Sequence, residues 1–110
     1  MFESIKNNSD FLKAYRHGKS YANRYLVMYV RKNDLDRNRY GITVSKKVGN
    51  SVVRSRSKRL IYESYRLNVN DIKPGYDFVF VARSAINEKK YSDVEAAMIN
   101  LLKKAGIYLK

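Results

Sequence analysis

The chain has 110 residues, which is enough for one domain with a modest hydrophobic core but not for two. Its formal net charge is +13, so we expect a polyanionic partner, of which nucleic acid is the commonest. The absence of cysteine excludes disulfides, Cys-based zinc sites and thiol nucleophiles, and the single histidine, His17, excludes a histidine cluster for a metal. No apolar run approaches the roughly 20 residues of a membrane span. No secretion signal is evident, so we expect a cytoplasmic protein.

The N-terminal half of the chain predicts one helix followed by two strands. Asn8 or Ser9 can cap a helix that runs through residues 10–16, and Gly18 would end it in the left-handed conformation. Residues 25–31 predict a strand. After a polar loop, residues 39–45 alternate between large apolar side chains and small or polar ones. Because the loop is short, we expect the two strands to form an antiparallel pair with one apolar and one exposed face.

The C-terminal half predicts a helix, a strand and a second helix. Asn50 or Ser51 can cap a helix through about Arg66, with its apolar face formed by Val53, Ser57, Leu60 and Ser64. Residues 77–82 form a continuous apolar run, which is typical of a central strand buried on both faces.

The last helix is predicted from its ends and its apolar stripe. Ser92 and Glu95 have the spacing of a capping box, and Gly106 would stop the helix after about Ala105. Its core stripe would be Val94, Met98, Leu101 and Leu102. The predicted fold is therefore α+β, a single domain over residues 1–110 with a small mixed sheet packed by three helices, in the order α-β-β-α-β-α.

A basic segment is the strongest functional signal in the sequence. From Arg37 to Tyr62 there are eight Lys or Arg residues and no Asp or Glu. Such cations neutralise phosphates and fix the register of a nucleic acid without reading its bases. The candidate RNA-binding residues are Lys46, Lys47, Asn50, Arg54, Arg56, Lys58 and Arg59. A solvated basic helix face is the plainer interpretation, and a structural role for Arg56, near the apolar side, is equally open.

A second candidate surface is aromatic. The chain has ten tyrosines, four phenylalanines and no tryptophan, and a tyrosine ring can stack on a base while its hydroxyl stays wet. A groove between the first helix and the sheet could hold an unpaired strand, with these lining residues: Phe11, Tyr15, Val27, Tyr29, Thr43 and Ser45. Arg24 is a candidate phosphate contact at its edge. Phe11 and Val27 could instead belong to the core.

Residues 46–61, KKVGNSVVRSRSKRLI, resemble the arginine-rich core motif of the bacterial ribonuclease P protein component. The family pattern there is Lys-Lys, a Gly-Asn turn, then Arg-Asn-Arg and Lys-Arg on a helix. Further blocks agree in order and spacing, at residues 10–18, 22–24 and 76–83, so the resemblance covers nearly the whole chain. Two positions depart from the pattern: Ser55 replaces the central Asn, and Ser51 replaces the usual Ala.

The resemblance implies a left-handed βαβ crossover and an accessory subunit of an RNA-based endoribonuclease. The basic helix would dock on the catalytic RNA subunit, and the cleft, with Phe11, Tyr15, Val27 and Tyr29, would hold the single-stranded 5′ leader of precursor tRNA. Mg²⁺, held mainly by the RNA subunit, would support hydrolysis. The chain would carry no catalytic side chain of its own, and we expect no membrane and no obligate protein partner. No carboxylate pair suggests a dedicated metal site, but Mg²⁺ bound to the protein in phosphate-rich surroundings stays open.

Two other interpretations remain open from the sequence. A ribosomal or other structural RNA-binding protein would also be small, basic and free of cysteine, but would need no aromatic cleft. A stand-alone protein nuclease would cleave without added RNA, and the residue inventory argues against it.

Overall fold

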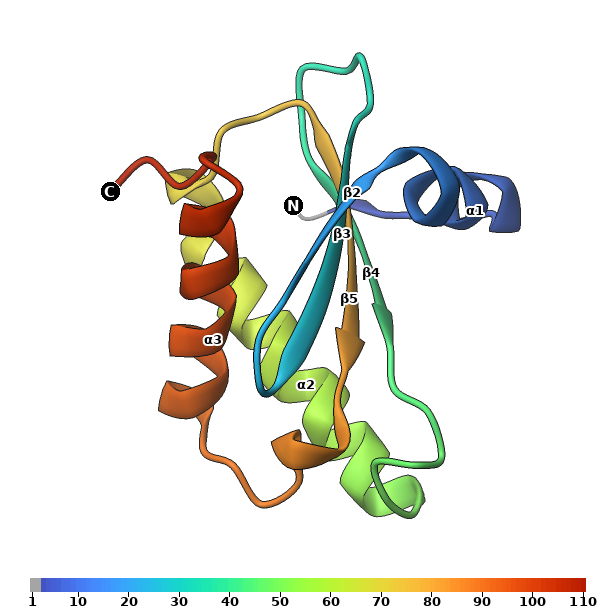
Figure 1. Cartoon of the computed structure of the whole chain (residues 1–110), viewed down its shortest axis with the longest axis vertical. Helices are drawn as coiled ribbons and strands as arrows, with labels where there is room; N and C mark the ends of the chain where they lie inside the picture. Colours follow the sequence, from blue (N-terminus) through green and yellow to red (C-terminus); the bar gives the residue numbers. More distant parts are fainter. Residues whose placement is uncertain (1–2) are drawn as a thin grey trace.

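The computed structural model describes residues 3–110 and places five strands in one mixed sheet, in the order β1-β4-β5-β3-β2. Helices α2 and α3 cover one face of this sheet, and the short helix α1 lies against the other (Figure 1). The elements, in chain order, are β1 Glu3–Ser4, α1 Asn8–His17, β2 Lys19–Ala22, β3 Leu26–Lys32, β4 Arg39–Thr43, α2 Ser51–Asn68, β5 Tyr76–Ala82 and α3 Tyr91–Lys104. The predicted α+β class is confirmed, with two short strands, β1 and β2, that the sequence did not suggest.

Strand β5 occupies the centre of the sheet, as its apolar run predicts. Phe78, Val79 and Phe80 are all fully buried, and they alternate between the two faces. β5 pairs in parallel with β4 and antiparallel with β3. The predicted antiparallel pairing of β3 with β4 is therefore wrong: β5 lies between them, because only a strand that is apolar on both faces suits the middle position. Strands β4 and β5 are joined through α2, which gives the predicted βαβ crossover.

The main core lies between the sheet and helices α2 and α3. Phe78 and Phe80 meet the ring of Tyr65 from α2, with ring centroids 6.1 and 5.9 Å apart. The predicted stripe of α3 is confirmed, since Val94, Met98, Leu101 and Leu102 are all fully buried. On α2 the predicted face is confirmed in part: Ser57 and Ser64 are fully buried, whereas Val53 and Leu60 are only partly covered. The buried face extends to Ile61 and Tyr65.

Helix ends differ from the sequence prediction in three places. Asn7, not Asn8 or Ser9, caps α1, because its side-chain oxygen accepts the N–H of Asp10 at 2.9 Å. Gly18 ends α1 in an extended conformation, with φ −83°, so the left-handed prediction is wrong. Glycine suits this position because a Cβ would lie 2.5 Å from the carbonyl oxygen of Ala14.

The capping box predicted for α3 is also displaced. The helix begins two residues earlier, at Tyr91 after the cap residue Lys90 in place of Ser92, and the carboxylate of Asp93 accepts the N–H of Lys90 at 3.0 Å. Glu95 instead accepts bonds from the Tyr91 hydroxyl and the Asn68 amide, each at 2.8 Å. Gly106 follows the end of this helix, as predicted, and its φ of +73° is left-handed.

Candidate nucleic-acid interface

The predicted basic surface is assembled from the loop after β4 and the first half of α2. Asn50 caps the helix, since its side-chain oxygen accepts the N–H of Val53 at 3.0 Å. Val48 is buried and anchors the loop, whereas Lys46 and Lys47, immediately before it, are exposed. A rigid cap and a buried anchor therefore hold the cations of the loop close to the helix N-terminus.

Four arginines and lysines on α2 differ in how they are held. Lys58 and Arg59 are exposed and form no ion pair within residues 3–110. Arg54 is half-buried, and its Nε has no hydrogen-bond partner among the described residues. Arg56 turns toward the protein, where its Nη2 donates to the carbonyl oxygen of Lys89 at 2.7 Å. This bond ties α2 to the segment before α3, which is the structural role left open for Arg56.

The predicted cleft begins where α1 crosses the other face of the sheet. The ring of Phe11 rests on Gly41 of β4, so closely that a Cβ at Gly41 would lie 2.6 Å from two ring carbons. The rings of Tyr15 and Tyr29 meet edge to face at 4.8 Å. Beside them is a hollow of about 390 Å³, whose lining includes Phe11, Tyr15 and Thr43. Phe11 also packs on a small core of Ile5, Ala14 and Val79, so it serves both the core and the wall of the hollow.

A second hollow, of about 610 Å³, continues toward the basic surface. Its lining includes Arg24, Ser45 and Lys47. Between the two hollows the sheet floor is formed by Val27 and Thr43, both of which pair in register with Val81 of the central strand. Of the seven predicted cleft residues, Phe11, Tyr15, Val27, Tyr29 and Thr43 therefore lie on the α1 face of the sheet, whereas Arg24 and Ser45 lie beyond the strand ends and line the second hollow beside Lys47.

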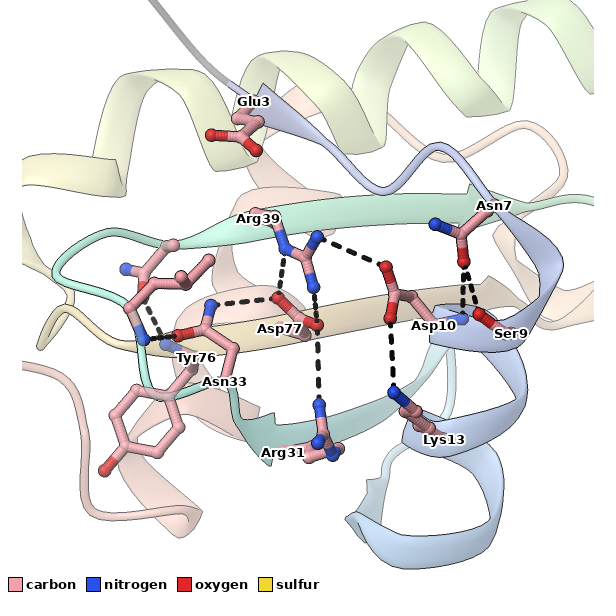
Figure 2. Close-up of polar contacts among 12 residues, drawn as sticks. Glu3, Asn7, Ser9, Asp10, Lys13, Arg31, Asn33, Arg39, Tyr76 and Asp77 are labelled. Carbon is pink, nitrogen blue, oxygen red and sulfur yellow. Dashed lines mark hydrogen bonds and ion pairs between the residues drawn. The ribbon is translucent and has the colours of Figure 1, made fainter.

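A buried ionic network that the sequence did not suggest fixes α1 on this face (Figure 2). Asp77, fully buried at the start of β5, accepts two bonds from the guanidinium of Arg39, at 2.8 Å from Nε and 2.6 Å from Nη2. Asn33 donates to the same carboxylate at 2.9 Å, and Arg31 lies 3.9 Å away. The third nitrogen of Arg39 donates to Asp10 of α1 at 3.3 Å.

This network links helix to sheet through opposite charges with little access to water. The bond to Asp77 is the main cause that raises the pKa of Arg39, with the nearby charges of Asp77 and Asp10 adding to it. The signal in the sequence was the position of Asp77, since a charged residue that opens a buried strand needs a partner. The sequence alone did not indicate which arginine that partner is.

The described residues offer few side chains that could bind a metal ion or act as an acid or base. No group of three His, Asp or Glu side chains within residues 3–110 is arranged to hold a metal ion. Two of the carboxylates nearest the cleft, Asp10 and Asp77, are already bound to Arg39. Over the same residues, no helix is both long and apolar enough to cross a membrane.

The fold and the site define a small, basic α+β protein with the features of the nucleic-acid-binding class: exposed cations that form no ion pair within residues 3–110, and an aromatic hollow on the α1 face of the sheet. Comparison with known proteins narrows the class. The Ribonuclease P family model matches residues 2–106. The "Ribonuclease P protein component" of Clostridium botulinum (strain Loch Maree / Type A3) is 61% identical over 105 residues, which cover 94% of this chain and 95% of that protein. The chain belongs to the ribonuclease P protein family.

Solved structures agree with this assignment. The RNase P protein of Staphylococcus aureus superposes with a TM-score of 0.88 at 34% identity, over 98% of this chain and 99% of that one. The RNase P protein of Thermotoga maritima gives a TM-score of 0.85 at 34% identity, over 93% and 96% of the two chains. The fold is therefore shared along nearly the whole length of each protein.

Proposed function

We propose that this chain acts as the protein subunit of ribonuclease P, binding the catalytic RNA subunit and the 5′ leader of precursor tRNA. One observation carries the proposal: exposed cations on α2 and its preceding loop form no ion pair within residues 3–110, and Lys47 of that loop lines the second hollow, next to the aromatic cleft on the α1 face of the sheet. Family membership supports it, because the relatives carry the name of that subunit. The interpretation as a structural RNA-binding protein accounts for the charge but not for the cleft.

The two surfaces suit two different tasks. Lys46, Lys47, Lys58 and Arg59 would contact phosphates of the RNA subunit, which releases counterions and positions the protein. The cleft suits a single strand, because its unpaired bases can stack on Tyr15 and Tyr29, each stack contributing roughly 1–3 kcal/mol. The bases of a duplex are already stacked on one another and would not stack on these rings. Arg24 and Lys47, at the far hollow, would accompany the leader backbone where the two surfaces meet.

The chemistry of cleavage belongs, in this proposal, to the RNA and its Mg²⁺. Asp10 and Asp77 are occupied by Arg39, so neither is free to bind a metal or to activate a water molecule. The protein would raise the effective affinity for precursor tRNA, hold the leader in one register and let the RNA act at low Mg²⁺. The same proposal places it in the cytoplasm, where precursor tRNA is processed, without an obligate protein partner.

The test is cleavage of precursor tRNA at low Mg²⁺ by a bacterial ribonuclease P RNA, with and without the purified protein. We expect cleavage at the mature 5′ end only when both are present. The variant Lys58→Ala/Arg59→Ala should weaken binding to the RNA subunit and lower the slope of log affinity against log salt by about 2. The control Lys6→Ala/Lys90→Ala removes the same charge from exposed sites outside both surfaces and should leave the slope unchanged.

The cleft is tested separately with Tyr29→Ala. This variant should reduce discrimination between precursor and mature tRNA while binding of the RNA subunit stays intact. A protein that binds many RNAs tightly but never stimulates cleavage would instead be a structural RNA-binding protein. If Lys58→Ala/Arg59→Ala and Tyr29→Ala both lost RNA-subunit binding and precursor discrimination to the same extent, the basic surface and the cleft would not be separate sites.

A further inference from the structure

A third hollow lies mainly on the α3 face of the sheet, opposite the cleft, with His17 at the end of α1 reaching its edge. It has a volume of about 450 Å³ and sits beyond the end of α3, against β2, β3 and the start of β5. Its floor is apolar, with Val30 of β3 and Ile107 both buried. The volume falls within the roughly 300–1,000 Å³ that is typical of small-molecule sites. None of the predicted RNA- or leader-binding residues lines it, so it is separate from both surfaces of the proposed function.

The rim of this hollow is basic. His17, Lys19 and Lys32 are exposed side chains at its edge, and none of the three forms an ion pair within residues 3–110. None of the nine residues that line the hollow is an Asp or a Glu. Lys19 pairs in register with Val30, and Lys32 is two residues further along the same strand, so both ammonium groups flank one apolar floor. Cations with no internal partner are best satisfied by an external anion.

The walls of the hollow are aromatic. Tyr21 of β2 and Tyr76 of β5 line it, and each is only partly buried, so part of each ring is accessible. Tyr76 pairs in register with Lys32, which places a ring beside a cation. Accessible tyrosine rings next to unpaired lysines are the combination that recognises a nucleotide, because the base stacks on the ring and the phosphate meets the cations.

We infer that this hollow, named here the β2–β5 pocket (His17, Lys19, Tyr21, Lys32 and Tyr76), binds one unpaired nucleotide of an RNA strand. The base lies on the apolar floor between Tyr21 and Tyr76, and the 5′ phosphate is held by Lys19 and Lys32. A duplex does not fit this description, since its bases are already stacked and paired. The sheet separates the pocket from the leader cleft, so the nucleotide bound here is a different one from those in the cleft.

The experiment is a titration of ¹⁵N-labelled protein with adenosine 5′-monophosphate, followed by NMR, with inorganic phosphate as a parallel titrant. We expect saturable amide shifts at Lys19, Val30 and Ile107 with the nucleotide, and binding by phosphate alone about tenfold weaker, since stacking is lost. Lys19→Ala/Lys32→Ala should weaken nucleotide binding at these amides about tenfold. The Lys6→Ala/Lys90→Ala control should bind like the unmodified protein, and Tyr29→Ala should retain the pocket shifts.

Three results would overturn the inference. Shifts confined to Phe11 and Thr43 would place the nucleotide in the cleft only. Equal affinity for phosphate and nucleotide would show that the pocket binds anions without recognising the base. If no amide shifts saturated, the pocket would not bind the nucleotide. Because these readouts do not involve cleavage of precursor tRNA, the inference can fail while the proposed function holds, and the reverse is also true.

Discussion

Replacing Asp77 with Asn tests whether the buried network holds the molecule together. The change keeps the size of the side chain but removes the charge that accepts two bonds from Arg39, whose side chain is only 17% exposed. Removing one member of a buried ion pair costs about 3–5 kcal/mol, because the other charge remains buried. Asp10 still faces Arg39 at 3.3 Å, so we expect the lower end, about 3 kcal/mol.

The measurement is urea unfolding at neutral pH, followed by far-UV circular dichroism. With a slope of about 1–3 kcal/mol per molar urea, the midpoint should fall by roughly 1–3 M. Asp36→Asn is the matched control: Asp36 is 94% exposed and its bridge to Arg37 is 3.5 Å long, so its loss should cost less than about 1 kcal/mol. If the two variants lost stability equally, the buried network would not be what fixes α1 and the sheet.

A double-mutant cycle sharpens the same test. Adding Arg39→Met to Asp77→Asn removes the stranded charge, so the double variant should be less destabilised than the sum of the two single variants. Strict additivity of the two losses would show that Arg39 and Asp77 do not interact energetically.

Three further substitutions test other features. Gly41→Ala should cost about 1–3 kcal/mol in urea unfolding and weaken leader binding, because the new methyl group collides with the ring of Phe11; unchanged stability and leader affinity would contradict that packing. Asn50→Ala should lower the free energy of unfolding by about 1 kcal/mol through loss of the α2 cap, and a melting temperature equal to that of the parent would refute the cap's contribution. Burial is the main cause that raises the pKa of Tyr65 above its ordinary value of 10.0. Above pH 10 the phenol of Tyr65 ionises in the unfolded chain but not in the folded one, so the free energy of unfolding falls as the pH rises. In urea titrations at alkaline pH, Tyr65→Phe should therefore lose less stability than the parent protein. Identical losses would exclude this contribution.

The elements that could be predicted from sequence are those set by local signals. The apolar run of β5, the stripe of α3 and the Asn cap of α2 each depend on residues within a few positions of one another. The basic loop and helix were located for the same reason, since a Gly-Asn turn and helical spacing place the cations together. The cleft residues lie on separate elements, and the family resemblance was needed to assign them a common role.

Features that depend on distant pairs could not be predicted. β4 pairs with β5 and not with β3. This order is decided by comparing all the strands of the sheet, since the strand that is apolar on both faces takes the central position. Arg39 is 38 residues from Asp77 and 29 from Asp10, so nothing local linked the three. The β2–β5 pocket likewise joins the beginning of β2 to residues beyond α3, and no local pattern indicated it.

The central place of β5 has a consequence for how the protein is made. Only the β2–β3 hairpin can form from neighbouring residues, since β3 and β4 both await a strand that ends at Ala82. During synthesis the edges of β3 and β4 that face β5 therefore stay unpaired until about three-quarters of the chain has been translated, which exposes them to wrong partners. Helix α2, which carries the basic surface, is encoded just before β5. The basic face therefore gains its support from the closed sheet only after β5 has been translated.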